Sequence, residues 1–420
     1  MRLLLTIILF TAIAHACSPT PCWSDLGSGT KLSISGIVPA DGAGGSTWQG
    51  NGTPMPYTSN LYAVVDAWSG GFARTKSGSE ALCIFGSGHN DNGDNSLYCL
   101  NLASLTWSRP SGPQVYTDAD YGNCPVGLPS SSPTAPNAVH STDNLAYLIS
   151  TDQLHKFNGG IACGNGFHTA DQWTYDFAGA SWTRNDPTSG FQLACSTLTN
   201  AGSCGSSGYD GASVYDPTSQ EVFQMIPVAG TVYIASWTPA TNVQTNTLTS
   251  HTGGEWLTWD VDPAHNLIIG MGRESSASST PHIMKLDISN PASPVLSDLA
   301  VDSSCTTIAG AFAPGFSYYS VDGLFYAWPV NGTTTYYTYD DQANTCTAHS
   351  AGGSAPANVD GNFPVDGGIY GRFRCIAAKQ GCYVVTNVAA DTFKLDLSSG
   401  GTTPMAVIGG TRIKGGVKIQ

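Results

Sequence analysis

Short stretches in which apolar and polar residues alternate recur along most of the chain. Ser96 to Leu102 and Thr335 to Asp340 are examples, and turn residues such as Gly, Pro, Asn and Asp bound each stretch. A period of two residues is typical of β-strands with one buried face. Almost no segment shows the 3.6-residue period of an amphipathic helix. The pattern therefore predicts an all-β protein.

The predicted strands fall into a longer repeat. Each unit has a first strand, a second apolar strand, a loop, a third strand that often ends in Asp, and in some units a closing Trp. The units are Leu61–Ala67, Ala81–Phe85, Ser96–Leu102 and Trp107; Asn137–Ile149, Leu154–Phe157, Gln172–Phe177 and Trp182; Tyr209–Tyr215, Glu221–Ile226 and Thr231–Trp237; Trp256–Val261, Asn266–Met271 and His282–Ile288; Phe316–Val321, Leu324–Trp328 and Thr335–Asp340; Arg372–Ala377, Cys382–Thr386 and Asp391–Leu397.

Six such units predict a single β-propeller of four-stranded blades, because blades recur roughly every 40 to 50 residues before insertions. Six blades are favoured, with a seventh between residues 289 and 313 as an alternative, and a β-sandwich is the competing fold. Strands at Lys31–Ile37 and Met405–Ile413 could complete the last blade from both ends of the chain. The prediction is one propeller domain over residues 17–420.

Two segments resemble Kelch repeats: residues 81 to 107, and Gln172–Phe177 followed by Trp182. The chain further resembles secreted Kelch-like propellers of the galactose-oxidase central-domain type. That group carries a Gly-Gly-Gly-His-x-Asp-Tyr hairpin in the first blade and a Gly-Arg-Phe-Arg strand in the last. Here Gly86-Ser-Gly-His89 and Gly371-Arg-Phe-Arg374 match, whereas Ser87 and Asn92 depart from the pattern. The resemblance implies a propeller fold.

The first 16 residues have the layout of a secretory signal peptide. Arg2 supplies a positive start, Leu3 to Ala14 is mostly apolar, and Ala14-His-Ala16 offers a cleavage site. A lipoprotein with Cys17 acylated is the weaker alternative. No later segment is long and apolar enough to cross a membrane. The sequence predicts a secreted, extracellular protein with no membrane partner.

Twelve cysteines agree with an oxidising compartment. Their spacing indicates local disulfides, and no Cys-x-x-Cys pair is present to favour a metal. The flanking pairs are Cys83–Cys99, Cys375–Cys382 and Cys195–Cys204, and compatible but undetermined pairs are Cys17–Cys22, Cys124–Cys163 and Cys305–Cys346. Asn51 and Asn331 begin Asn-Gly-Thr sequons and would carry N-glycans in a eukaryotic host.

The net charge of the chain limits the classes of molecule that it can bind. The net charge is −14, with 16 Lys and Arg against 30 Asp and Glu. Nucleic acid is excluded as a partner, because phosphate binding needs clustered basic residues. The same balance repels polyanions at long range.

Two groups of polar residues should lie on one face of the propeller. One group stands at the start of a predicted inner strand, and the other lies in a loop between a second and a third strand. In a propeller blade, antiparallel order places these two positions on the same side. The predicted catalytic residues are His140, Tyr209, Arg372 and Arg374, and the predicted substrate-binding residues are His89, Trp256, His168 and Arg273.

This set would suit β-elimination on a uronate-containing polysaccharide. Arginine can bind a carboxylate bidentately, His or Tyr can remove the α-proton, and Trp can pack against a sugar ring. At fold level the chain looks similar to ulvan lyases, which are secreted propellers that work in this way. The favoured hypothesis is therefore a secreted polysaccharide lyase. The alternatives are a non-catalytic propeller that binds glycans or proteins, and a structural extracellular glycoprotein.

Several candidate residues also have a structural interpretation. His89 could cap its hairpin, His140 could be a packed residue at a strand start, Tyr209 could belong to the core, and Arg372 and Arg374 could pair with Asp residues between blades. Residues 90 to 94 superficially resemble a calcium loop, but an Asn-Gly turn explains them better. The sequence therefore predicts no cofactor and no metal, and it leaves the oligomeric state open.

Overall fold

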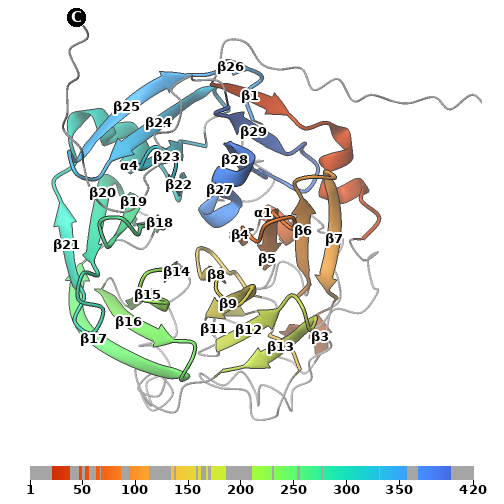
Figure 1. Cartoon of the computed structure of the whole chain (residues 1–420), viewed down its shortest axis with the longest axis horizontal. Coiled ribbons are helices and arrows are strands. Elements are labelled where there is room, and N and C mark those ends of the chain that lie inside the picture. The colour runs from red at the N-terminus through yellow and green to blue at the C-terminus, as the bar shows by residue number, and fades with distance from the viewer. Residues whose placement is uncertain are drawn as a thin grey trace, which may run out of the picture.

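The computed structural model describes residues 21–37, 47–49, 53–55, 63–66, 68–86, 94–112, 134–136, 139–157, 159–161, 167–168, 172–185, 211–228, 231–252, 256–275, 278–330, 332–356 and 368–398. Six sheets surround a central axis and form a β-propeller, as the sequence predicts (Figure 1). In each blade the first strand lies nearest the axis and the following strands lie progressively outward.

The first three blades follow chain order. Blade 1 contains β4 (Gly70–Arg74), β5 (Ala81–Phe85), β6 (Leu97–Asn101) and β7 (Thr106–Ser111). Blade 2 contains β8 (Leu145–Leu148), β9 (Gln153–Phe157), β12 (Gln172–Asp176) and β13 (Ser181–Arg184). Blade 3 contains β14 (Ala212–Asp216), β15 (Glu221–Val228), β16 (Thr231–Thr238) and β17 (Val243–Thr252).

The last three blades complete the ring. Blade 4 contains β18 (Trp256–Asp262), β19 (Leu267–Ser275), β20 (Ser278–Asp287) and β21 (Val295–Leu299). Blade 5 contains β22 (Gly315–Tyr319), β23 (Leu324–Trp328), β24 (Thr335–Asp340) and β25 (Thr345–Ser350). Blade 6 contains β27 (Phe373–Ile376), β28 (Gly381–Val384), β29 (Phe393–Asp396), β1 (Cys22–Asp25) and the short β26 (Gly352–Gly353).

Small elements decorate this ring. The pairs β2 (Thr47–Gln49) with β3 (Thr53–Met55), and β10 (Gly160–Ile161) with β11 (Phe167–His168), form two-stranded sheets. The short α-helices are α1 (Ala63–Asp66) and α4 (Thr306–Ala309), and the 3₁₀ helices are Ser28–Thr30, Leu32–Ile34, Ser303–Cys305, Tyr370–Arg372 and Ala377–Lys379. No helix in the described part of the chain has the length and apolar character that crossing a bilayer requires.

The first chain segment closes the ring. Strand β1 pairs antiparallel with β29, and β26 pairs parallel with β1. In Figure 1 the red β1 lies beside the blue β29, so blade 6 combines strands from opposite ends of the described chain. An N-terminal strand was predicted for this place, but at Lys31–Ile37, which contains a 3₁₀ helix instead. The predicted partner strand at Met405–Ile413 lies outside the described residues.

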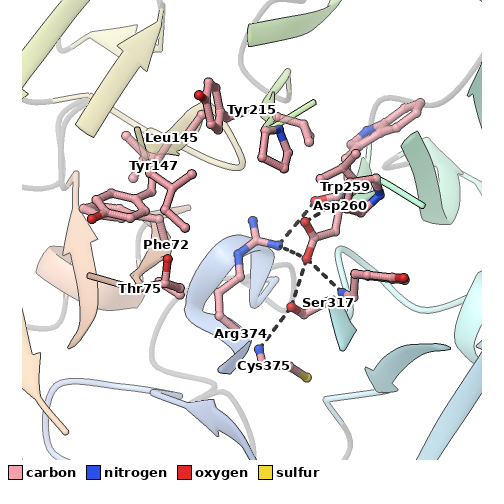
Figure 2. A pocket seen from close by; sticks show the side chains of 18 of the residues that line it. Phe72, Thr75, Leu145, Tyr147, Tyr215, Trp259, Asp260, Ser317, Arg374 and Cys375 are labelled. Carbon is pink, nitrogen blue, oxygen red and sulfur yellow. Dashed lines mark hydrogen bonds and ion pairs between the residues drawn. The ribbon is translucent and has the colours of Figure 1, made fainter. Parts of the chain in front are cut away.

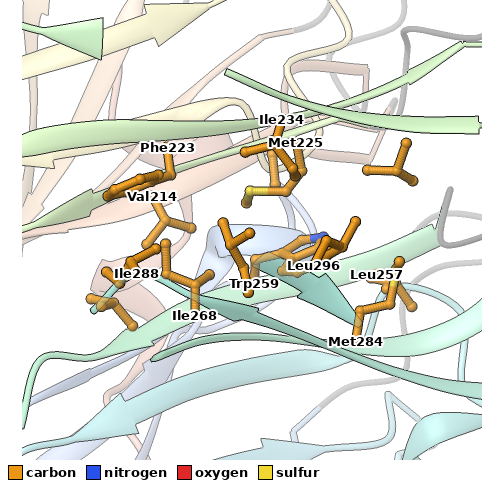
Figure 3. Packing of buried hydrophobic residues seen from close by; sticks show 14 residues of the cluster. Val214, Phe223, Met225, Ile234, Leu257, Trp259, Ile268, Met284, Ile288 and Leu296 are labelled. Carbon is orange, nitrogen blue, oxygen red and sulfur yellow. The ribbon is translucent and has the colours of Figure 1, made fainter. Parts of the chain in front are cut away.

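Apolar faces of neighbouring blades build the core. Between blades 3 and 4, Val214, Phe223 and Ile234 face Leu257, Trp259 and Ile268 (Figure 3). All six side chains are at most 5% exposed. Blade-to-blade packing thus uses the alternating apolar positions from which the strands were predicted.

The acidic or amide residue that ends many third strands shapes the following turn. Asp176 Oδ1 accepts a hydrogen bond from the Ala178 amide, and Asp340 Oδ1 accepts from the amides of Gln342 and Ala343. Asn101 Oδ1 does the same for Ala103 and Ser104. Such side-chain-to-backbone bonds stabilise tight turns, which explains the recurring Asp at this point of the repeat.

Three disulfides lie within the described residues, and all three pairings appear among the predicted ones. Cys83–Cys99 and Cys375–Cys382 join directly opposed residues of adjacent strands. Cys305–Cys346 ties the segment before blade 5 to its outer strand. The other predicted pairs, Cys17–Cys22, Cys124–Cys163 and Cys195–Cys204, include residues outside the described ones.

Candidate functional site

Arg374 lies near the propeller axis and ties four blades together. From β27 its Nη2 donates to Asp143 Oδ1 at 2.9 Å, just before β8 of blade 2. Its Nη1 donates to the carbonyl oxygens of Trp259 at 3.3 Å and Phe316 at 3.2 Å, in blades 4 and 5. Its Nη1 also lies 3.5 Å from Asp260 Oδ2. These contacts match the interblade pairing that the sequence left open as an alternative to catalysis.

Asp143 is the buried partner in this arrangement. Its other oxygen, Oδ2, accepts a hydrogen bond from the Trp259 amide at 2.7 Å. Burial raises the pKa of the Asp143 carboxyl to about 7, although Arg374 and the Trp259 amide act in the opposite direction. The pair therefore carries a net charge between zero and +1 near neutral pH.

A cavity of about 240 Å³ lies beside Arg374, between the inner strands of all six blades. Its lining runs from the middle of these strands to residues that follow their last positions. The lining residues are Phe72, Ala73, Thr75, Leu145, Ala146, Tyr147, Ile149, Ser213, Val214, Tyr215, Pro217, Trp259, Asp260, Val261, Pro263, Ser317, Tyr318, Ser320, Arg374 and Cys375.

Aromatic rings form much of the wall. In Figure 2, Phe72 and Tyr147 lie on one side of Arg374, Tyr215 lies above it, and Asp260 lies opposite. The tyrosine hydroxyls are anchored: Tyr147 Oη donates to Asp152 Oδ1 at 2.8 Å, and Tyr215 Oη shares a hydrogen bond with Ser150 Oγ at 2.9 Å. Fixed hydroxyls hold the rings in place, so the wall is a preformed apolar surface.

Asp260 supplies the main charged group of the lining besides Arg374. Its Oδ2 accepts from Ser317 Oγ and from the Tyr318 amide, both at 2.9 Å, and its side chain is 22% exposed. Arg374 is 10% exposed. Polar groups that are both oriented by the protein and partly accessible can fix a polar ligand in an otherwise apolar pocket.

The cavity lies at the face where the inner strands end, which we call the strand-end face. The sequence predicted a funnel at the opposite, strand-start face. There the inner strands bond directly to one another: the Thr142 amide donates to the Trp68 carbonyl, and the Ser213 amide donates to the Asp143 carbonyl. Close interblade bonding at the strand starts, together with Arg374, leaves the cavity on the strand-end side.

Arg372, predicted as catalytic, is fully buried. Its guanidinium donates to the backbone carbonyls of Ser69, Val385, Thr386 and Gly368, at distances between 2.6 and 3.0 Å. These bonds fix the start of β27 against blade 1. The structure therefore places Arg372 in the framework of the fold rather than against the cavity.

Two predicted substrate-binding residues do lie together on the strand-start face. Trp256 and Arg273 are directly paired across β18 and β19. Phe312 contacts both residues. The centroid of its ring lies 4.6 Å from the ring centroid of Trp256 and 4.4 Å from the guanidinium carbon of Arg273. His140, predicted as catalytic, is buried and packs 4.7 Å from the Trp68 ring on the same face.

Several predicted residues are not tested by the structure. His89, Tyr209, Asn51 and Asn331 lie outside the described residues. His168 belongs to β11, but its side chain is not described.

Sequence reasoning missed the cavity residues Phe72, Tyr147, Tyr215, Tyr318 and Asp260. A signal was present for Asp260, because it interrupts the apolar run of β18 at a position facing the axis. The tyrosines gave no such signal, since aromatic residues are common throughout β-strands.

One group of described residues has the donor atoms of a metal site: Asp262, His265 and Asp341. It adjoins the cavity through Tyr318, whose hydroxyl is hydrogen-bonded to Asp262.

Comparison with known protein families finds no matching family model, and comparison with curated protein sequences finds no match. Solved structures that resemble this chain include the following three. A fungal alcohol oxidase of the AA5 family in complex with copper has a TM-score of 0.40 and 10% identity, over 82% of this chain and 76% of that chain. The protein YjhT has a TM-score of 0.44 and 9% identity, over 81% and 95%. A nidogen–laminin complex has a TM-score of 0.38 and 8% identity, over 70% and 83%.

Proposed function

We propose that this protein is a secreted glycan-binding propeller that holds one sugar unit in its central cavity. The observation that carries the proposal is the set of anchored rings around a partly exposed Arg374–Asp260 pair. Sugar rings pack their C–H faces on aromatic side chains, while their hydroxyls need both donors and acceptors. Arg374 donates, Asp260 accepts, and Tyr147 and Tyr215 provide the apolar surface.

The volume of the cavity limits the ligand. At about 240 Å³ it lies just below the roughly 300–1,000 Å³ of pockets that enclose drug-sized ligands. A single sugar unit, at a chain end or as a branch, fits this size better than several consecutive units.

The charges favour a neutral or amino sugar over a uronate. Arg374 faces two carboxylates, Asp143 at 2.9 Å and Asp260 at 3.5 Å. An anionic ligand would meet Asp260 beside the only cation of the described lining, and desolvating two like charges is costly. The net charge of −14 acts in the same direction.

Secretion is part of the proposal. It rests on the leader-like first 16 residues and on the three disulfides, which persist in oxidising compartments.

The predicted polysaccharide lyase is the second candidate, located on the strand-start face. The stack of Trp256, Phe312 and Arg273 favours it, because an aromatic surface beside a guanidinium suits an acidic sugar. The four backbone carbonyls around Arg372 count against a lyase, because they occupy the guanidinium that was predicted to bind the carboxylate of the substrate.

Glycan-array binding tests the main proposal. Ser320 is exposed and lines the cavity, so Ser320→Trp should block the cavity without disturbing the core. We expect the native protein to bind neutral or amino-sugar glycans and Ser320→Trp to lose that binding. Ser354→Trp, at an exposed serine beside β26, is the matched control and should bind normally. Equal binding by the native protein and Ser320→Trp would overturn the cavity as the site.

The lyase is tested separately with uronate-containing polysaccharides, by the ultraviolet absorbance of unsaturated sugar ends. A signal that is lost in Arg273→Ala but kept in Ser320→Trp would establish catalysis on the strand-start face. A flat trace on every polymer would exclude β-elimination of those substrates.

A further inference from the structure

The turn that follows β18 places a carboxylate and an imidazole side by side. Asp262 ends the strand with its side chain fully buried, and its Oδ1 accepts a hydrogen bond from the Ala264 amide at 2.8 Å. Three residues later, His265 Nδ1 lies 2.5 Å from Asp262 Oδ2. The His265 side chain is 47% exposed, so one side of the ring faces solvent.

A second carboxylate reaches the same place from blade 5. Asp341 directly follows β24, and the residue is 9% exposed. One ligand atom from each of Asp262, His265 and Asp341 lies within 4.8 Å of the other two. Asp341 Oδ2 is buried and accepts no hydrogen bond from any described residue. A buried carboxylate oxygen without a partner is costly unless a donor or a cation satisfies it.

The charges around Asp262, His265 and Asp341 favour the binding of a cation. Among the ion pairs of the described residues, none brings a Lys or Arg to Asp262 or Asp341, and His265 is the basic partner of Asp262. Asp340 adds a further carboxylate next to Asp341 in the chain.

We propose that Asp262, His265 and Asp341 bind one divalent transition-metal ion, of which Zn²⁺ is the best match. Two carboxylate oxygens and one imidazole nitrogen are ordinary Zn²⁺ ligands, whereas Ca²⁺ and Mg²⁺ take oxygen ligands almost exclusively. Three protein ligands leave a fourth position, which the exposed side of His265 makes accessible to water or a ligand. The metal would join blade 4 to blade 5 at the strand-end face.

Metal binding requires a small rearrangement of the three ligands. With ligand distances of about 2.0–2.2 Å around Zn²⁺, ligand atoms lie roughly 3.3 Å apart in a tetrahedral site. Rotation of the exposed His265 and of Asp341 in its turn can lengthen the His265 Nδ1–Asp262 Oδ2 distance of 2.5 Å and shorten any pair that is as much as 4.8 Å apart. Tyr318 already orients Asp262 through its hydroxyl, as an outer partner of a metal ligand does.

Zinc titration of the full-length secreted protein tests the site, after chelator treatment and dialysis, by calorimetry and thermal melting. We expect one Zn²⁺ per chain and a rise in melting temperature on binding. Co²⁺ in place of Zn²⁺ should give the visible absorbance of a low-coordinate N/O site. Each of His265→Asn and Asp341→Asn should weaken Zn²⁺ binding by at least about tenfold.

His251→Asn is the matched control, because His251 Nδ1 also pairs with an aspartate, Asp298, at 3.1 Å on the surface. It should leave Zn²⁺ affinity unchanged. Unchanged affinity in both His265→Asn and Asp341→Asn, or a loss of affinity in His251→Asn instead, would overturn the proposed site. The measurement involves no sugar, so its outcome is independent of the proposed glycan binding.

Discussion

Arg374 could bind a substrate or fix a fold with the same guanidinium, and its surroundings decide between these roles. Its contacts with Asp143, Trp259 and Phe316 join blades 2, 4, 5 and 6 across the axis. Only its partly exposed edge faces the cavity. Arg374 therefore shapes the floor of the proposed site chiefly by holding the inner strands in register.

Arg374→Met should cost about 3–5 kcal/mol of unfolding free energy, because it leaves the buried Asp143 carboxyl group and the carbonyls of Trp259 and Phe316 without their charged hydrogen-bond donor. Chemical denaturation of the native and variant proteins measures this difference. Lys31→Met is the control: the Lys31–Asp391 pair is 3.9 Å apart and more exposed, so its loss should cost about 1 kcal/mol or less. Equal small losses for both variants would contradict the axial role of Arg374.

Two buried groups should oppose each other in the pH dependence of stability. Burial raises the pKa of Asp143 to about 7, so the folded protein binds the extra proton between pH 3.8 and 7 and stability falls as pH rises. Burial lowers the pKa of His155 to about 3, so the unfolded chain binds the extra proton between pH 3 and 6.5 and stability increases as pH rises. The two contributions cancel between about pH 4 and 6.5.

Single variants should expose each contribution. In His155→Gln, stability should decrease from pH 4 to 7 by at most about 1.4 kcal/mol per pH unit. In Asp143→Asn, stability should instead increase as pH rises towards 6.5. Melting temperatures across this range measure both slopes, and identical pH profiles for the two variants would show that neither pKa is displaced by burial.

At the scale of the strand, Trp23 anchors β1 in blade 6. Its ring lies 5.9 Å from Trp328 and 6.5 Å from Phe373, and its Nε1 donates to the Thr334 carbonyl at 3.1 Å. Trp23→Ala should cost about 3–5 kcal/mol, as for other buried aromatic truncations. Thermal melting measures the loss.

Limited proteolysis identifies which part of the protein Trp23→Ala destabilises. Cleavage of Trp23→Ala should begin in residues 21–37, because β1 detaches before the remaining blades open. Trp237→Ala, a buried tryptophan in β16 of blade 3, is the control and should leave β1 protected. First cleavage elsewhere in both variants would contradict this order.

Strands with local turn signals were predictable, whereas strands shaped by neighbouring blades were not. Leu324–Trp328 and Thr335–Asp340 have the predicted bounds, because Asp and Gly turns delimit them. The first inner strand was predicted at Leu61–Ala67, which contains helix α1; the strand is Gly70–Arg74. A Cβ on Gly70 would lie 1.7 Å from the Thr142 carbonyl oxygen, so close blade contact requires a residue of low strand propensity there.

At the scale of the molecule, the sequence predicted six blades in a ring, and the structure has six. The sequence could not predict where along the axis the cavity lies, because that depends on which side chains of the inner strands meet at the centre. Asp143 and Arg374 are far apart in the chain, and no local pattern connects them. No local pattern connects the proposed metal ligands either: Asp262 and His265 are near neighbours, but Asp341 comes from the next blade.

Ring closure by β1 also orders events during protein synthesis. The ribosome makes residues 22–25 before any of the six blades, yet their partners in β26 and β29 are made only after five blades have been translated. Until then blade 6 lacks its outer edge, and the apolar face of Trp23 has no cover. Products truncated before residue 393 therefore cannot close the ring, because they lack the strand with which β1 pairs.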